Sequence, residues 1–404
     1  MKIGAVISEF NPFHSGHEYI IKKFKELMGD NSCVIALMSG DYVQRGEPAI
    51  FPKEIRARAA AESSADLVLE LPLPYSISSA EGFASYAVSL LNELAVVDRL
   101  FFGSESADID LLRTVAEALL KDEITEKITD KMKEGISFPA AREEVLRSEG
   151  LLDNNITIKA NDILAVEYIK ALIKSDSQIK PCAIRRRGAE HDSHSSSKGI
   201  ASAAHIRKLV FAGETADIYL PEKAAKLYKK AVREGRGPVS LWSMEPMILA
   251  RLRFLKAGEL ALLPDAAEGI ENLLYKNINR AGNLKEIIEL SVSKRYPRAR
   301  IKRMLLCAAL GISKDDAEKY KKPPYFRVLA SNAAGTKILR QIARKSSLPA
   351  LIKPAGVKKL GQSAESFFEL SSLARDFYSL AFRNECYKIP GEEYRLSPFI
   401  KKFS

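Results

Sequence analysis

The first half of the chain alternates short apolar runs with segments in which apolar residues recur at helical spacing. Five runs predict β-strands, at residues 2–7, 32–38, 66–71, 99–102 and 180–184. Five helical patterns are interleaved with them, at residues 17–28, 53–64, 79–94, 108–120 and 162–173. Runs such as residues 33–37 are apolar on both faces, as strands buried beneath two layers of helices should be. The pattern predicts an α/β domain with a Rossmann-like parallel sheet.

Polar motifs come directly after four of these strands. Residues 11–17 follow the first strand, residues 39–41 the second, residues 103–105 the fourth and residues 185–188 the fifth. In parallel sheets covered by helices, ligands bind beyond the carboxyl ends of the strands. We therefore expect these motifs to meet at one ligand site.

Beyond about residue 210 the strand pattern fades, and helical stretches rich in Lys, Arg, Ala and Leu predominate. The polar, Ser-rich segment 189–199 predicts a loop of the first domain, either a lid over the ligand or a plain solvated loop. We place the domain boundary near Ala212-Gly213-Glu214. It separates an α/β domain of residues 1–212 from a mainly helical, basic region of residues 213–404.

Composition narrows the class of protein. The 404 residues are 46% hydrophobic, which suffices for two or three cores. No run approaches the roughly 20 apolar residues of a membrane-spanning helix, and polar residues interrupt the apolar N-terminus too early for a secretion signal. The four cysteines include no CxxC pair, which argues against a disulfide framework or zinc site and favours the cytoplasm. The net charge of +11 favours a polyanionic partner.

The motif His14-Ser15-Gly16-His17 stands where the first strand gives way to the first helix. Two imidazoles three residues apart can both donate hydrogen bonds to a phosphate at the helix N-terminus, and Gly16 lets the backbone approach it closely. Such groups suit in-line transfer at an α-phosphate, where the protein positions reactants and stabilises negative charge. Ordinary cap histidines are the alternative; a zinc pair lacks further ligands of suitable spacing.

Three other segments carry candidate ligand-binding groups. Asp41, Gln44 and Arg45 supply a carboxylate, an amide and a guanidinium, which either bind a substrate or form a surface turn with a salt bridge. Gly103 has no β-carbon, so adenine or ribose can lie against its backbone; a common glycine turn at the end of a strand is the alternative. Three arginines end the fifth strand at residues 185–187, where a guanidinium can fork onto phosphate oxygens; a solvated basic cluster is the alternative.

Positive charge is concentrated in residues 280–327, with 13 Lys and Arg against 5 Asp and Glu. A helix beginning near Pro297 would carry Arg300 and Arg303 along one side. Phosphate contacts from such cations give RNA affinity and salt dependence without specifying sequence. We predict RNA binding here, with a solvated helix face as the alternative. The cations concerned are Lys294, Arg295, Arg298, Arg300, Lys302 and Arg303.

These motifs, in this order, resemble the bacterial tRNA(Met) cytidine acetate ligase family of the HIGH-type nucleotidyltransferase superfamily. The resemblance rests on residues 4–17, 39–46, 102–105, 161–164, 185–193 and 201–207, and continues more loosely through residues 294–306. It implies that ATP activates acetate as acetyl-adenylate and that the acetyl group passes to the exocyclic amine of the wobble cytidine of elongator tRNA(Met). Residues 1–212 are then the ATP-binding catalytic domain and residues 213–404 the RNA-binding region.

The resemblance also assigns roles to individual residues. The implied catalytic residues are His14, His17 and Arg186, and the implied substrate pocket is formed by Ser39, Asp41, Gln44 and Arg45. Ser202 and Arg207 would hold the β- and γ-phosphates, although Ala204 replaces the usual Thr of that motif. Asn161 would contact the nucleotide, while its place before a helical pattern equally suits a helix cap. The ATP-binding residues are Ile7, Ser8, Glu9, Phe10, Asn11, Pro12, Phe13, His14, Ser15, Gly16, His17, Glu18, Tyr19, Ile20, Gly103, Asn161, Arg186, Ser202 and Arg207.

Two other functions compete with this interpretation. An adenylyltransferase acting on a small phosphorylated metabolite accounts for the histidine motif but leaves the basic half unused. A non-catalytic RNA-binding protein with a nucleotide fold is opposed by the intact His14, Gly16 and His17, while Ala204 mildly favours it. We expect Mg²⁺ to accompany ATP, but no carboxylate cluster marks a metal site, and no protein partner is indicated.

Overall fold

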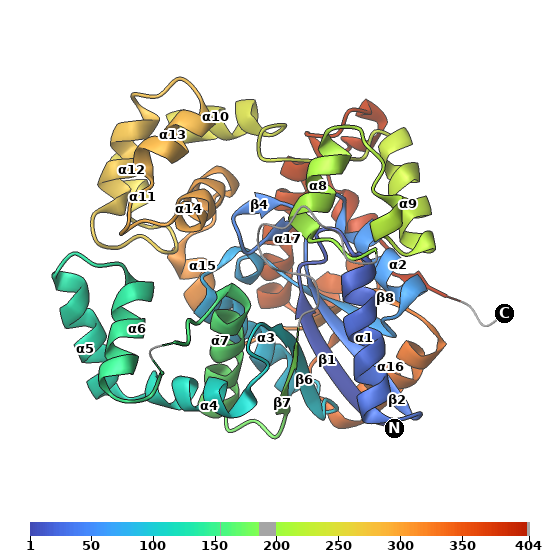
Figure 1. Cartoon of the computed structure of the whole chain (residues 1–404). Coiled ribbons are helices and arrows are strands. Elements are labelled where there is room, and N and C mark those ends of the chain that lie inside the picture. Colours follow the sequence, from blue (N-terminus) through green and yellow to red (C-terminus); the bar gives the residue numbers. More distant parts are fainter. Residues whose placement is uncertain (154, 186–198, 402–404) are drawn as a thin grey trace.

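The computed structural model describes residues 1–153, 155–185 and 199–401, which form a twisted sheet with helices on both faces and two helical groups beside it (Figure 1). The strand order is β10-β8-β5-β2-β1-β6-β7, and β9 pairs with β8. The pairings among β1, β2, β5, β6 and β7 are parallel, whereas β8 is antiparallel to β5. The sheet strands are β1 Lys2–Ser8, β2 Ser32–Ser39, β5 Leu67–Leu71, β6 Arg99–Ser104, β7 Lys180–Arg185, β8 Phe326–Ser331, β9 Ala350–Leu351 and β10 Phe399–Ile400. A hairpin of β3 Tyr42–Val43 and β4 Glu47–Pro48 follows β2.

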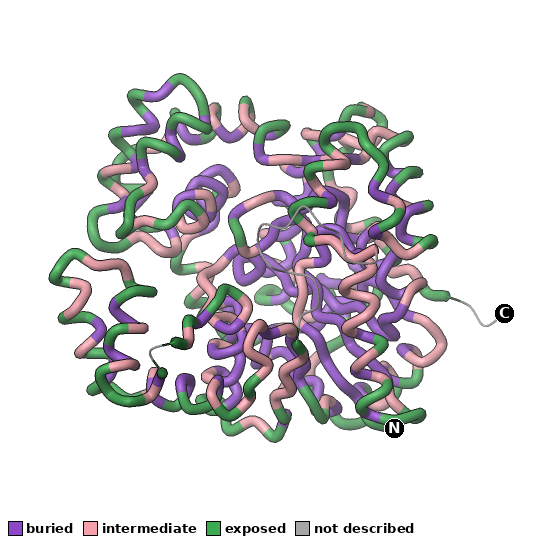
Figure 2. The backbone as a smooth tube through the Cα atoms, viewed as in Figure 1, coloured by how far each residue is buried: buried purple, intermediate pink, exposed green. Residues whose placement is uncertain are grey.

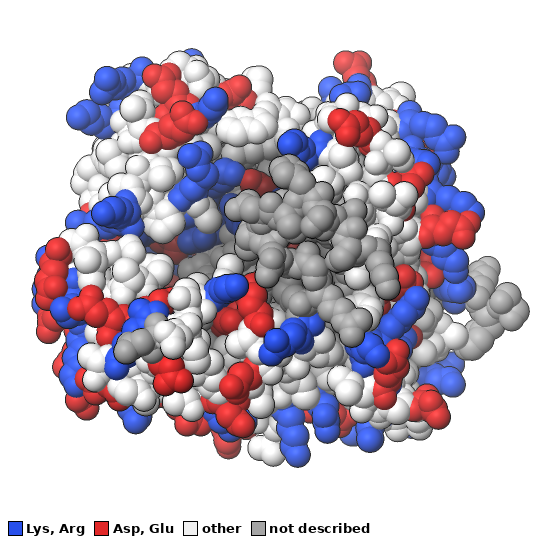
Figure 3. Space-filling view, viewed as in Figure 1, with Lys and Arg blue, Asp and Glu red and all other residues white. Residues whose placement is uncertain are grey.

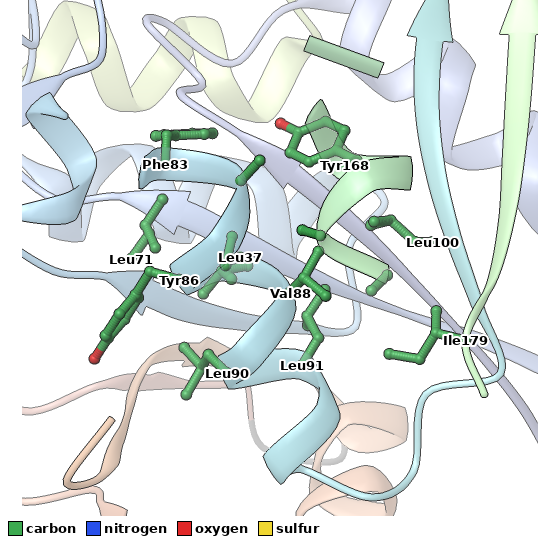
Figure 4. Close-up of a cluster of buried hydrophobic side chains, with 14 of the residues drawn as sticks. Leu37, Leu71, Phe83, Tyr86, Val88, Leu90, Leu91, Leu100, Tyr168 and Ile179 are labelled. Atoms are coloured by element: carbon green, nitrogen blue, oxygen red, sulfur yellow. The ribbon is translucent and has the colours of Figure 1, made fainter. Parts of the chain in front are cut away.

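Apolar side chains on alternate strand positions explain why helices cover both faces of the sheet. Ile35 and Leu37 of β2 belong to the core under α3 and α7, drawn in Figure 4, whereas Ala36 and Met38 belong to the core under α1 and α2. Buried residues accordingly line the sheet and the inner sides of the helices (Figure 2). The helices of the first half are α1 Ser15–Met28, α2 Lys53–Ser63, α3 Ala80–Glu93, α4 Ile109–Ala118, α5 Asp122–Lys133, α6 Phe138–Ser148, α7 Ala160–Lys174 and α8 Ala203–Phe211.

The second half contributes a helical group whose core also includes Tyr42, Leu73 and Ile77 of the first half. Buried side chains from α10 to α14, such as Ile248, Leu274 and Met304, form this core. The helices of this half are α9 Glu222–Arg233, α10 Glu245–Arg253, α11 Ala257–Leu260, α12 Ile270–Ile278, α13 Leu284–Ser291, α14 Arg298–Leu310, α15 Lys314–Lys319, α16 Ala333–Lys345 and α17 Gln362–Ser379. Among the described helices, none is long and apolar enough to cross a membrane.

All five predicted strands and all five predicted helices are present, with ends that differ by at most two residues. The pattern missed α5 and α6, which bury a small core against each other at one side of the molecule. It also missed β8, whose six residues are all buried within the sheet. The expectation that strands end near residue 210 is therefore corrected. The division at residue 212 itself stays a prediction. The shared core of α10–α14 favours it, whereas the return of β8 to the first sheet opposes it.

Candidate active site

The histidine motif forms the start of α1, immediately beyond the carboxyl end of β1. His14 is the N-cap residue, and its Nδ1 accepts a hydrogen bond from the backbone N–H of Gly16 at 3.0 Å. The Nδ1 of His17 accepts from the backbone N–H of His14 at 3.3 Å. Because both Nδ1 atoms are acceptors, a neutral imidazole at either position carries its proton on Nε2. The two rings lie with centroids 3.9 Å apart, so the motif presents a pair of donor rings at a helix N-terminus.

Gly16 is required by the position of the His14 ring. A β-carbon at residue 16 would lie 2.8 Å from Cε1 of His14 and 3.0 Å from its Nδ1. Any side chain there would push the ring away from the helix start. The glycine therefore serves the placement of the histidine as well as the approach of a ligand.

Side chains from distant elements hold the loop between β1 and α1. Arg207 of α8 donates to the carbonyl of Asn11 at 2.8 Å, and the side chain of Asn11 accepts from the N–H of Ile50 at 2.8 Å. The hydroxyl of Tyr228 accepts from the N–H of Phe13 at 3.0 Å. Ser202 caps α8 by accepting from the N–H of His205. The two predicted phosphate-binding residues of α8 thus belong to a helix that is attached to the histidine motif, and their contact with phosphate stays a prediction.

Arg56 is a residue of this region that the sequence did not reveal. Its guanidinium is fully buried and donates to the carbonyls of Phe51, Glu9, Ser39 and Gly40. It thereby ties the exits of β1 and β2 together. No motif marks it, because the partners are backbone carbonyls brought together only by the sheet.

Glu9 lies where the β1 exit meets the hairpin and α8. Burial raises the pKa of its carboxyl above the ordinary value, against the opposing effect of the Arg45 and Arg207 guanidinium groups. Burial also lowers the pKa of Arg207, which Glu47 and Glu9 oppose. Both arginines predicted to bind ligand therefore lie near one carboxyl group at the carboxyl edge of the sheet.

The four residues of the predicted substrate pocket have different surroundings. Ser39 and Asp41 are buried, Gln44 is half-buried and Arg45 is exposed. Asp41 accepts from the N–H of Lys53 at 2.8 Å and from Arg375 at 3.3 Å. Burial alone would raise the pKa of Asp41, but Arg375 and Lys53 outweigh it and hold that pKa below the ordinary value.

Asp41 therefore has protein partners that the sequence did not predict. Its carboxylate is engaged in a buried network that also contains Glu70, Arg327 and Glu393. These partners come from β5, β8 and the short helix Glu392–Arg395, so a sequence motif at residues 39–46 could not disclose them. Binding of substrate by Ser39, Asp41, Gln44 and Arg45 stays a prediction.

At the exit of β6 the predicted nucleotide contacts come together. The side-chain amide of Asn161 donates to Glu105 at 2.5 Å. The N-cap of α7 is Lys159, so Asn161 lies inside the first turn and does not cap the helix, which corrects that alternative. Gly103 is the fifth residue of β6, two positions before Glu105 in the chain. Arg186 and the segment 186–198 lie outside the described residues; Arg185 is exposed and donates to the carbonyl of Ser106 at 3.1 Å.

The predicted RNA-binding cations fall into two sets. Lys294, Arg295 and Arg298 are exposed before and at the start of α14, although Nε of Arg295 lies 3.7 Å from the Glu268 carboxylate. Figure 3 shows Lys and Arg side chains gathered where α14 lies in Figure 1. The second set is engaged within the protein: the contacts are Arg300 to the carbonyl of Asp265 at 2.9 Å, Lys302 to Glu47 at 2.5 Å, and Arg303 to the Asp265 carboxylate at 2.7 Å. The first set is the part of the segment that remains available to a partner.

The hairpin β3–β4 joins α14 to the active-site edge of the sheet. Gly46, at a φ of +72°, lies so close to α14 that a β-carbon there would be 2.5 Å from the N atom of Arg303. The adjacent Glu47 pairs with Lys302. The same hairpin carries Gln44, whose backbone N–H bonds to Glu9, and Arg45. α14 and the histidine motif therefore lie on either side of the β3–β4 hairpin.

Comparison with known proteins gives results that agree across the whole chain. Residues 1–392 match the model of the HIGH Nucleotidyl Transferase family. The chain is 38% identical to a tRNA(Met) cytidine acetate ligase of Thermoanaerobacter sp. (strain X514) over 99% of this chain and 100% of the relative. It is equally identical, with the same coverage, to the protein of that name from Clostridium perfringens (strain ATCC 13124). The crystal structure of apo Thermotoga maritima TmcAL has a TM-score of 0.93 at 32% identity, and the form bound with alpha-thio ATP has 0.91 at 31%, each covering 100% of both chains.

Proposed function

Because the chain belongs to the tRNA(Met) cytidine acetate ligase family of HIGH nucleotidyltransferases, we propose that it activates acetate with ATP and acetylates the wobble cytidine of elongator tRNA(Met). The observation that carries the proposal is the pair of adjacent imidazoles at the start of α1, tilted by 39° to each other, with Nδ1 of each ring used as an acceptor. We propose the cytoplasm as the place of action.

In the first step, an acetate oxygen attacks the α-phosphorus of ATP, and the bond to pyrophosphate breaks. His14 and His17 donate hydrogen bonds to phosphate oxygens as negative charge spreads over them, and the backbone N–H groups at the start of α1 favour the same charge. Arg207 and, by the family pattern, Arg186 neutralise the leaving pyrophosphate. Mg²⁺ would accompany ATP and withdraw charge from its phosphates. Within the described residues no group of three or more His, Cys, Asp and Glu could hold a metal ion, so we assign it no protein ligand.

In the second step, the exocyclic amine of the cytidine attacks the carbonyl carbon of acetyl-adenylate. AMP leaves with the electrons of the acyl–oxygen bond, and the amine loses one proton. The hairpin that carries Gln44 and Arg45 lies between the histidine motif and α14, which is where the target base would have to enter. Lys294, Arg295 and Arg298 would hold the phosphates of the same tRNA. We propose accordingly that residues 1–212 supply the chemistry and residues 213–404 the RNA contacts.

Incubation with labelled acetate, ATP and purified tRNA tests the proposal. Label should enter the RNA, and nuclease digestion should release it as acetylcytidine. Label that stays out of RNA, together with pyrophosphate exchange promoted by phosphopantetheine, would instead support the metabolite adenylyltransferase. Binding of tRNA without any ATP-dependent exchange would support a non-catalytic RNA-binding protein.

A further inference from the structure

Asp162 is a buried carboxylate in the first turn of α7 that faces the exit of β6. Only 4% of its surface is exposed, and four groups of the β6 exit donate to it. They are the hydroxyls of Ser104 and Ser106 and the backbone N–H groups of Glu105, at 3.0 Å, and Ser106, at 3.2 Å. Asp162 thus accepts most of the hydrogen bonds that residues 104–106, at the end of β6, can donate.

Glu105 returns the interaction from the opposite side. One carboxylate oxygen accepts from the side chain of Asn161 at 2.5 Å, and the other accepts from the backbone N–H of Asp162 at 3.1 Å. The N-cap residue of α7, Lys159, makes no side-chain cap bond, so Glu105 supplies the acceptor for the start of this helix. Two carboxylates at the positive end of α7 are favoured by the helix dipole. We call this reciprocal pair the Glu105–Asp162 clamp.

The clamp holds a turn whose backbone is strained at Ala107. Ala107 has a φ of +52°, in the left-handed region that residues other than glycine seldom adopt. Its N–H donates to the Ser104 hydroxyl at 2.8 Å, and that hydroxyl in turn donates to Asp162. Strained backbone persists where surrounding contacts determine it, and such places cluster at binding sites.

We propose that Asp162 is a positioning residue that keeps residues 103–107 in the shape that receives the base and ribose of ATP. This inference rests on the proposed function, because Gly103 is expected to lie beneath the nucleotide. Asp162 would contact the turn and not the reacting phosphates. Its loss should therefore weaken ATP binding while leaving the chemistry at the α-phosphorus and the RNA surface intact.

Asp162→Asn is the sharpest variant, because it preserves size but turns one acceptor oxygen into an NH₂ group that faces other donors. We expect ATP affinity to fall by about tenfold, the scale of removing one charge-assisted hydrogen bond. Calorimetry with a non-hydrolysable ATP analogue measures this without acetate or tRNA. A failure of the clamp is thereby distinguishable from a failure of the proposed acetate chemistry.

Asp66→Asn is the matched control. Asp66 is equally buried, at 4% exposed, and accepts from the N–H of Val34 at 2.8 Å and from the Asn332 side chain at 3.0 Å. It lies before β5, at the edge of the sheet opposite the histidine motif. We expect this variant to lower the melting temperature without changing ATP affinity. Equal losses of ATP affinity in both variants would overturn the proposal, because Asp162 would then be a purely structural residue.

The kinetic split provides a second criterion. In acetate-dependent pyrophosphate exchange, Asp162→Asn should raise the KM for ATP and leave kcat and the KM for acetate close to wild type. If Asp162→Asn does not fold, Ser104→Ala removes only the hydroxyl between Asp162 and Ala107, and ATP affinity should fall in the same direction by a smaller factor. Unchanged ATP affinity in whichever of these variants folds would overturn the inference.

Discussion

The starts of α1 and α14 differ in the charge that they place at the positive end of a helix. α1 begins with two imidazoles and has Glu18 in its first turn. α14 has no acidic residue in its first turn and carries Arg298 and Arg300 there instead. Cations at a helix N-terminus oppose the helix dipole and cost about 0.3–1 kcal/mol each. The start of α1 is thus a site for an anion within a balanced helix, whereas α14 concentrates positive charge against its own stability, as a surface for a polyanion would.

The two regions also differ in what positions their side chains. The rings of His14 and His17 are fixed by N–H groups two and three residues away in the chain. In α14, Lys302 and Arg303 are engaged by acids that lie much farther away along the chain, Glu47 and Asp265. The two rings are therefore oriented by local hydrogen bonds, on a loop that Arg207 and Tyr228 hold from distant elements. RNA binding at the second region depends on which cations the rest of the fold leaves exposed.

Removal of either imidazole should have the largest effect. His14→Ala and His17→Ala should each slow adenylate formation by at least ~10²-fold, the scale of losing one preorganised donor to developing charge. Acetate-dependent pyrophosphate exchange measures this step. Circular dichroism melts should show a modest change: His14 is the N-cap of α1, and loss of an N-cap costs about 1 kcal/mol. Near-wild-type exchange in both variants would show that His14 and His17 do not form the catalytic site.

Neutralising the exposed set should weaken RNA binding without impairing the ATP chemistry. The triple variant Lys294→Gln, Arg295→Gln and Arg298→Gln should bind tRNA more weakly. The slope of log affinity against log salt should become shallower by up to about 0.7–0.9 for each tRNA phosphate that the variant no longer neutralises. Filter binding across a salt series measures both. An unchanged slope would mean that this surface is merely solvated.

Arg303 provides the contrasting case within the same helix. It is 8% exposed and forks onto the Asp265 carboxylate through Nε and Nη2. Arg303→Gln should lower the free energy of unfolding by about 2 kcal/mol, because hydrogen bonds between two charged groups are removed. Denaturant titration measures this decrease. A variant that is as stable as wild type but defective in RNA binding would show that Arg303 contacts RNA and does not serve stability.

Arg298→Glu should give the smallest effect on the fold, and in the opposite direction. An acid at the first position of α14 complements the dipole and should stabilise the protein by about 0.3–1 kcal/mol. The same change should weaken tRNA binding by more than Arg298→Gln does, since it adds repulsion. Thermal melts at low salt, paired with tRNA titration, test both signs. A loss of stability together with normal RNA affinity would contradict the contrast drawn between the two helices.

The sequence predicted those parts of the molecule that depend on neighbours in the chain. The first five sheet strands and the histidine motif each follow from a short contiguous pattern. The buried role of Asp41 and the engagement of Arg300, Lys302 and Arg303 could not be predicted, because their partners lie far along the chain. β8 was missed for a related reason: a single six-residue segment among helices, interrupted by Arg327, carries no signal of the strand it will pair with.

Acetate-dependent pyrophosphate exchange without tRNA tests the central claim most directly, namely that ATP chemistry and RNA binding belong to separate regions. The measurement compares wild type with the triple Gln variant at Lys294, Arg295 and Arg298. We predict that exchange requires acetate, needs no tRNA and is equal in the two proteins, while transfer of labelled acetate to limiting tRNA is impaired only in the variant. Exchange that strictly requires tRNA, or that falls in the triple variant in the absence of tRNA, would contradict the account.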